Sequence, residues 1–139
     1  MQTDVTVLID WSSAEPVYAQ IARQIRSRIA SGDLTPGLAL PPVRVLASDL
    51  GVNLNTVARA YWLLEEEGFL RIRDRSGAEV TAPLRDADPA AVERLRQQLA
   101  AVLSRMRQAG LTLAEVRQQA ERELATLAGR DPERQLEAT

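Results

Sequence analysis

The chain has 139 residues, of which 45% are apolar, and it contains neither cysteine nor histidine. This length allows one ordinary domain or a small domain with an appendage but no long catalytic domain, and the missing residue types exclude a disulfide framework and an ordinary zinc or haem site. All 17 basic residues are arginine, and residues 1–82 hold 8 arginines against 10 acidic residues, so any affinity for nucleic acid must come from local placement of arginine.

The N-terminal segment MQTDVTVLIDWSSAEP carries a short apolar run between acidic residues, which is unlike a signal peptide. No apolar run in the chain reaches the length of a membrane span. We therefore expect a cytoplasmic protein without a membrane partner. Val5 to Trp11 is predicted either to lie as a strand against a later hairpin or to cover the core.

A scaffold helix is predicted between Ser13, a capping residue, and Gly32, where the periodic pattern stops. Apolar side chains recur along one face of this helix at four-residue spacing, with two smaller contributions beside them: Val17, Ile21, Ile25, Ile29, Tyr18 and Ala22. The other side of the helix holds polar residues: Gln20, Arg23, Gln24, Ser27 and Arg28.

Two shorter helices follow. The first is predicted to begin at Pro42, whose fixed φ suits a first helical position, and to end at Gly51; it buries Val43, Leu46, Ala47 and Leu50. The second is predicted to run from Asn53, an N-cap that leaves backbone amides pointing outward, to about Glu67. Its core face is Val57, Ala60, Tyr61 and Leu64, and its opposite face is Asn55, Ala58, Arg59 and Trp62.

A hairpin is predicted next, with strands Leu70 to Arg73 and Ala78 to Thr81 around the turn Asp74-Arg75-Ser76-Gly77. Leu38 to Leu40, after a Pro-Gly turn, is expected to add a third strand. The order of helix, turn, helix and hairpin predicts an α+β fold, a winged helix-turn-helix domain whose wing is this hairpin.

The C-terminal region is predicted to form two helices. Asp88 caps the first, Pro89 begins it and Gly110 ends it, while Thr112 and Glu115 form a capping box for the second, which runs to Gly129. The first helix carries a heptad seam, and an apolar stripe lines the second: Val92, Leu95, Leu99, Val102 and Met106, then Val116, Ala120, Leu124 and Leu127.

Two helices of this size cannot bury both stripes by themselves. We expect them to form a homodimer, with packing back onto the winged domain as the alternative. The predicted domains are therefore a winged domain over residues 1–82, a short two-helix dimerisation region over 83–129, and a flexible tail over 130–139.

The segment from Pro16 to Val80 resembles the DNA-binding domain of GntR-type bacterial transcriptional regulators, and the short C-terminal region is similar to that of the small YtrA-like branch. The matching positions run through the scaffold helix, both shorter helices and their turns: Tyr18, Gln20, Ile21, Ile25, Ile29, Gly32, Pro36, Gly37, Leu40, Pro41, Arg44, Leu46, Ala47, Leu50, Val52, Asn55, Thr56, Val57, Arg59, Ala60, Tyr61, Leu64 and Gly68. Four positions depart from the family pattern: Pro42, Leu54, Arg75 and Glu79.

The resemblance implies that Arg44 contacts DNA, with an ion pair to Asp49 or to an acid of the wing as the alternative. Side chains in the opening turn of the second helix reach base edges or phosphate most easily, and one turn later an arginine faces the same way. At the wing, the turn is expected to touch phosphate or the minor groove. The predicted DNA-binding residues are Arg44, Asn53, Asn55, Thr56, Arg59, Arg75, Ser76 and Gly77.

The resemblance further implies a homodimeric repressor that binds an inverted-repeat operator and controls a transporter operon and its own gene. A winged-helix module that binds protein instead of DNA is the alternative. The acidic balance fits that alternative, but the residues at the contacting positions argue against it: Arg44, Asn55, Thr56 and Arg59. An enzyme lacks support, because Glu65, Glu66 and Glu67 are consecutive in a helix and cannot converge on one point. The sequence predicts no cofactor, and although it leaves room for a small-molecule effector, no residue set identifies one.

Overall fold

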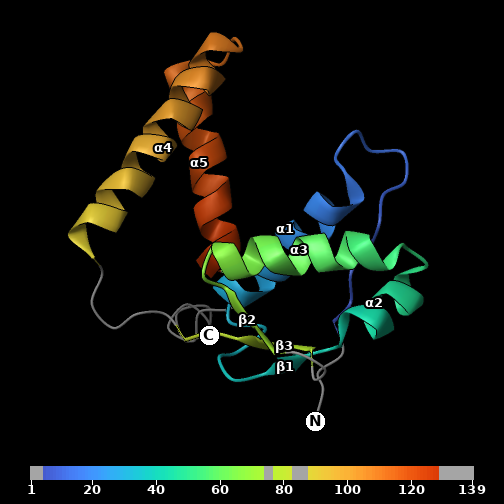
Figure 1. Ribbon diagram of the computed structural model, residues 1–139. Helices are drawn as coiled ribbons and strands as arrows, with labels where there is room; N and C mark the ends of the chain where they lie inside the picture. Colours follow the sequence, from blue (N-terminus) through green and yellow to red (C-terminus); the bar gives the residue numbers. More distant parts are fainter. Residues whose placement is uncertain (1–4, 74–76, 83–87, 129–139) are drawn as a thin grey trace, which may run out of the picture. The chain divides into compact units, whose positions relative to one another are not determined.

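The computed structural model describes residues 5–73, 77–82 and 88–128 (Figure 1). In chain order the elements are α1 (Val17–Ala30), β1 (Ala39–Leu40), α2 (Val43–Leu50), α3 (Leu54–Glu66), β2 (Leu70–Arg73), β3 (Gly77–Val80), α4 (Pro89–Gln108) and α5 (Leu113–Ala128). The described residues up to 82 form one compact unit, and those from 88 to 128 form a second. The predicted fold class is confirmed, while the domain boundaries stay a prediction.

Residues 5 to 10 cover the core and form no strand. Val7 is buried, and the backbone of Leu8 is held by the side-chain amide of Gln24, which accepts from the Leu8 N–H at 2.9 Å and donates to the Leu8 carbonyl at 2.7 Å. The predicted cap was wrong: the first helical residue follows Pro16, and the Ser13 hydroxyl accepts from the amide of Glu15 before the helix begins.

The prediction for Gln20 was also wrong: its side chain is buried, not exposed on the polar side of α1. Its side-chain oxygen accepts from the N–H of Asp10 at 2.8 Å, and its side-chain NH₂ donates to the carbonyls of Asp10 at 3.1 Å and Glu15 at 2.9 Å. The sequence pattern assigned this side chain to the outer face of the helix only because glutamine is polar. Here the N-terminal segment folds over the amide and satisfies its hydrogen bonds.

Gln20→Leu is therefore expected to destabilise the winged unit. The leucine would leave backbone groups of Asp10 and Glu15 without their partner, and one buried unsatisfied group costs about 1–3 kcal/mol. Urea unfolding should show that loss, with Gln24→Leu as a milder control because its hydrogen bonds lie at the exposed surface. An unchanged midpoint in Gln20→Leu would mean that the amide does not hold the segment.

The helix-turn-helix was predicted correctly, except that Pro42 precedes α2 instead of beginning it. Gly51 ends α2 with a φ of 68°, a left-handed conformation that favours glycine. Val57, Ala60, Tyr61 and Leu64 are fully buried along α3, as their spacing predicted. The Tyr61 hydroxyl donates to the carbonyl of Pro41 at 2.7 Å, and burial raises the pKa of this phenol, so it stays neutral and ties α3 to the start of α2.

The three strands form one antiparallel sheet in the order β1-β3-β2, which confirms the third strand expected from the sequence. Ala39 and Leu40 pair with Glu79 and Ala78, while Leu70 pairs with Val80 in the hairpin. The second wing strand begins one residue earlier than predicted, at Gly77. Asp74, Arg75 and Ser76 lie outside the described residues.

The three acidic residues at the end of α3 are exposed, and two of them still make specific contacts. Glu65 accepts from the backbone N–H of Ile72 at 2.7 Å, and Glu67 pairs with Arg26 at 2.6 Å. The guanidinium of Arg26 also lies 5.9 Å from the centre of the Phe69 ring. These acids therefore anchor the hairpin and α1 to the end of α3.

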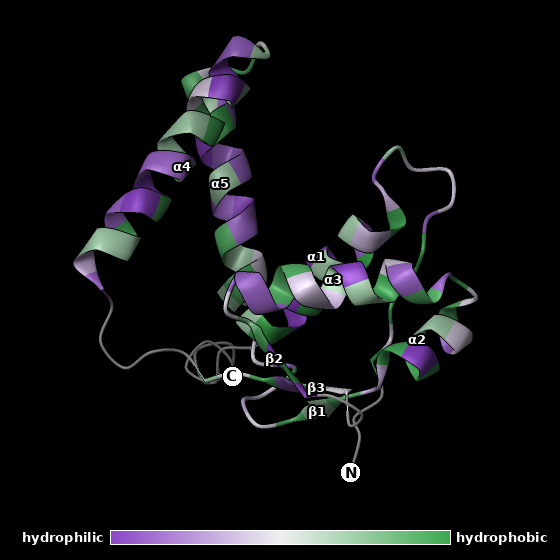
Figure 2. Ribbon diagram, in the orientation of Figure 1, coloured by the Kyte–Doolittle hydropathy of each residue, from purple (hydrophilic) through white to green (hydrophobic). Residues whose placement is uncertain are grey.

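The second unit is a pair of helices with the predicted caps at their N-terminal ends. Asp88 accepts from the N–H of Ala90 at 3.1 Å, and Thr112 and Glu115 exchange hydrogen bonds at 3.1 and 3.2 Å as a capping box. Figure 2 shows hydrophobic and hydrophilic residues alternating along α4 and α5. None of the described helices combines the length and apolarity needed to cross a membrane.

Candidate nucleic-acid interface

The outer face of α3 carries two parallel stripes, because residues four apart lie nearly in line on a helix. One stripe is polar and consists of the exposed side chains of Asn55 and Arg59. The other is apolar and consists of Leu54, Ala58 and Trp62. The sequence predicted Asn55, Ala58, Arg59 and Trp62 as the face opposite the core, which we call the reading face, and none of the four is buried.

The sequence suggested that Arg59 projects freely from this face, but in the structure it contacts another side chain. Its guanidinium carbon lies 3.8 Å from the centre of the Tyr18 ring on α1. A stacked guanidinium keeps its N–H groups at the rim of its plane, where they stay available to a phosphate or a guanine. Tyr18 therefore restricts where the cation points without using its donors.

The polar side chains in the opening turn of α3 differ in role: one caps the helix, one is half-buried and one is exposed. Asn53 is the N-cap, and its side-chain oxygen accepts from the backbone N–H of Asn55 at 2.8 Å. Thr56 is half-buried, whereas the Asn55 side chain is exposed at the start of the polar stripe. Of these three residues, the structure places Asn55 best for contact with a ligand.

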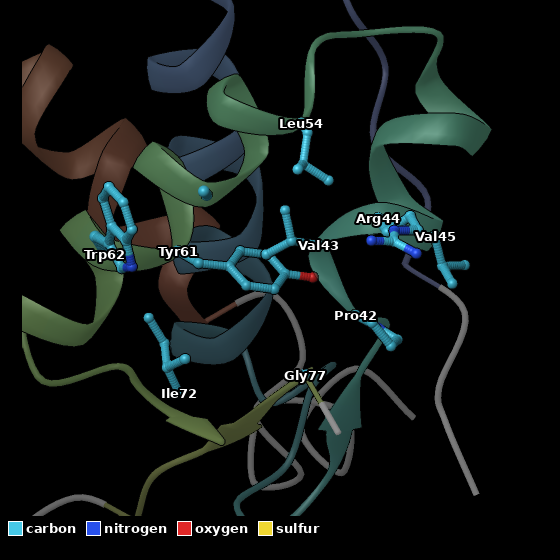
Figure 3. A pocket seen from close by; sticks show the side chains of 10 residues that line it. Pro42, Val43, Arg44, Val45, Leu54, Tyr61, Trp62, Ile72 and Gly77 are labelled. Carbon is cyan, nitrogen blue, oxygen red and sulfur yellow. The ribbon is translucent and has the colours of Figure 1, made fainter. Parts of the chain in front are cut away.

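Arg44 lies in the first turn of α2 and borders a groove of about 640 Å³. Figure 3 shows Arg44 and Val45 projecting from α2, and Leu54 and Trp62 projecting from α3, around this groove. Among the described residues Arg44 makes no ion pair, with Asp49 or any other acid. The Arg44 side chain is exposed and lines the same groove as the first residue of α3, Leu54.

The described part of the wing carries two arginines, while Arg75 lies outside the described residues. Arg71 and Arg73 are exposed on β2, and Arg73 pairs with Glu79 at 3.3 Å. Gly77 is buried, and a Cβ there would lie 2.8 Å from the Leu40 carbonyl oxygen. Its φ of 92° also favours glycine, so its role in the wing is to let β3 approach β1.

Comparison with known proteins decides the family. Residues 17–80, which run from α1 to the end of β3, match the model of the bacterial regulatory proteins of the gntR family. YtrA from Sulfolobus acidocaldarius, a GntR-family transcription factor of known structure, is 39% identical and superposes with a TM-score of 0.60 over 72% of this chain and 95% of its own. The chain belongs to the GntR family.

Two curated GntR-like relatives extend the comparison. YhcF of Bacillus subtilis, an HTH-type transcriptional regulator, is 33% identical over 106 residues, which are 76% of this chain and 88% of YhcF. The HTH-type transcriptional repressor YtrA of the same organism is 42% identical over 64 residues, which are 46% of this chain and 49% of YtrA. The second match therefore spans about half of that repressor.

For a GntR-type domain, two features of the reading face were missed by sequence reasoning. The contact between Tyr18 and Arg59 joins residues of different helices, so no local pattern predicts it. The apolar stripe was visible at four-residue spacing in the sequence, but Leu54 was noted only as a departure from the family pattern. The structure brings this stripe together with Arg44 in one groove.

Proposed function

We propose that this GntR-family chain is a sequence-specific transcriptional repressor that binds double-stranded DNA as a homodimer. The observation that carries the proposal is the exposed face of α3, where Asn55 and the stacked Arg59 form the polar stripe and Arg44 of α2 borders the groove at the neighbouring apolar stripe. In a helix-turn-helix the second helix enters the major groove while the first crosses the backbone. Both arginines are forks suited to phosphate or guanine.

The remaining predicted DNA contacts keep their place in this proposal. Asn55 and Thr56 open the reading helix, Asn53 holds its N-terminus, and Arg75 and Ser76 belong to the turn of the wing. Because residues 1–82 carry more acids than arginines, binding would depend on these local contacts rather than on long-range attraction. In this proposal the protein acts in the cytoplasm, where it binds its operator.

The homodimer is supported by apolar surface that one chain leaves exposed. Val92, Leu95, Leu99 and Val102 follow the predicted seam of α4, and each is about half exposed or more. Between the helices lies a groove of about 340 Å³ lined by Leu99, Val102, Leu103, Met106, Gln119, Ala120, Glu123, Leu124 and Leu127. Apolar surface of this kind marks an interaction site.

Val116 is the exception among the predicted dimerisation residues, because it is already buried in the single chain. The proposed interface therefore consists of the seam of α4 with Leu124 and Leu127 of α5. A dimer would place two reading helices on an inverted-repeat operator, one at each half-site. Repression follows the resemblance to the repressor YtrA of Bacillus subtilis.

A mobility shift with the duplex upstream of the protein's own gene tests the proposal. We expect a retarded complex that a scrambled duplex of the same composition does not compete away, and that weakens steeply as salt is raised. The duplex upstream of an adjacent transporter operon is tested in the same assay. Equal competition by both duplexes, or no complex at low salt, would instead favour a winged helix that binds protein.

A further inference from the structure

The groove beside the reading helix has an unusual lining for a surface that meets DNA. Its residues are Pro42, Val43, Arg44, Val45, Leu54, Ala58, Tyr61, Trp62, Ile72 and Gly77. Among the described residues that line the groove, Arg44 is the one charged side chain and none is acidic, and the Tyr61 hydroxyl donates to the Pro41 carbonyl. The groove is therefore an apolar surface with a cation at its edge.

Three of the apolar side chains that line the groove are exposed to solvent rather than buried in the core. Leu54 is 46% exposed, Val45 is 43% exposed and Trp62 is 64% exposed. Leu54 is the first residue of α3 and Ala58 lies one turn later, so both belong to the part of a reading helix that reaches base edges. Trp62 lies about 12 Å from Leu54 along the helix axis, at about 1.5 Å per residue.

We propose that Leu54, with Ala58 beside it, contacts the C5-methyl group of a thymine in each operator half-site. This inference rests on the proposed DNA-binding function and names a base that the site selects. In the major groove the apolar group on a base edge is the thymine methyl, which small apolar side chains contact. Arg44 at the edge of the same groove binds the anionic backbone or a neighbouring guanine, and no acidic side chain among the lining residues opposes it.

The test uses a duplex selected by the full chain from a random library. Each thymine of the half-site is replaced by deoxyuridine, which removes the methyl group and leaves the base pairing unchanged. We expect one or two positions per half-site at which the replacement weakens binding about fourfold, since burying one methylene is worth about 0.8 kcal/mol. Elsewhere the replacement should have no effect.

Leu54→Ala connects that sensitivity to the side chain. Leu54 lies outside the core cluster and alanine favours helix, so the variant should keep its melting temperature. It should bind the thymine and deoxyuridine duplexes equally at one of the sensitive positions. Leu8→Ala removes a leucine that is 76% exposed and lies outside the groove, and it should keep the full fourfold difference.

The possible outcomes separate this inference from the function on which it rests. A selected duplex that tolerates deoxyuridine at every thymine, or a Leu54→Ala variant that keeps the sensitivity, would overturn the methyl contact while DNA binding stands. A selected half-site without thymine would overturn it as well. Failure to select any duplex would remove the proposed function itself.

Discussion

Leu99→Glu is expected to convert the protein from a dimer to a monomer in sedimentation. Leu99 is 56% exposed in one chain, belongs to the heptad seam of α4 and lines the groove between α4 and α5. Burying a leucine fully contributes about 1.5–3 kcal/mol, and an unpaired carboxylate in the same place is strongly disfavoured. The monomer should still fold, since α4 has no buried residue in the single chain.

Ser104→Glu is the matched control for this variant. It adds the same charge to the same helix, but position 104 lies opposite the seam and outside the groove. Sedimentation of Ser104→Glu should show the dimer of the parent chain. A Leu99→Glu protein that sediments as a dimer would move the interface away from α4, and a monomeric parent chain would remove the dimer from the proposal.

Alanine at Arg44 or Arg59 is expected to weaken operator binding without changing the fold. A bidentate contact to guanine is worth about 1–3 kcal/mol, and its loss relaxes discrimination at one base pair of each half-site. A phosphate contact would instead weaken all duplexes about equally and lower the salt slope by about one unit. Affinity measured at fixed salt on the operator and on a mutated duplex separates these two roles.

The contact with Tyr18 makes a finer prediction for Arg59. Tyr18→Phe keeps an aromatic face under the guanidinium and should keep operator affinity, whereas Tyr18→Leu removes the cation–π attraction and should weaken it in part. Tyr18 also packs against the core, so melting temperatures are needed beside the affinities.

Arg23→Ala is the control for loss of positive charge. Arg23 lies on α1 of the same unit and pairs with Glu15, so this variant changes the net charge by the same amount away from the reading face. It should bind operator like the parent chain. Parent-like affinity in folded Arg44→Ala and Arg59→Ala would withdraw both arginines from DNA reading.

Local patterns predicted the elements of this fold because each has its own start and stop. Gly51 ends α2 in a left-handed conformation and Asn53 caps α3, and both signals lie within a few residues of the helix that they define. The apolar face of α3 was predicted equally well, since the spacing of four and three residues at Val57, Tyr61 and Leu64 leaves one choice of buried side.

Contacts between distant segments could not be predicted in this way. Gln20 is buried because residues 10 to 15 fold over its amide, and hydropathy alone treats an amide as a surface group. Arg59 meets Tyr18 across two helices, and Gly77 is buried because β1 packs against it. Each of these depends on how elements pack, which no single window of sequence contains.

Selection of duplexes from a random library tests most directly the central claim that α3 reads a DNA operator. The full chain should enrich an inverted repeat whose half-sites lie one helical turn, or a multiple of it, apart. The same selection with Arg59→Ala should yield the repeat with one base pair per half-site relaxed. No enriched sequence with the parent chain, or a single half-site without its inverted partner, would contradict the account.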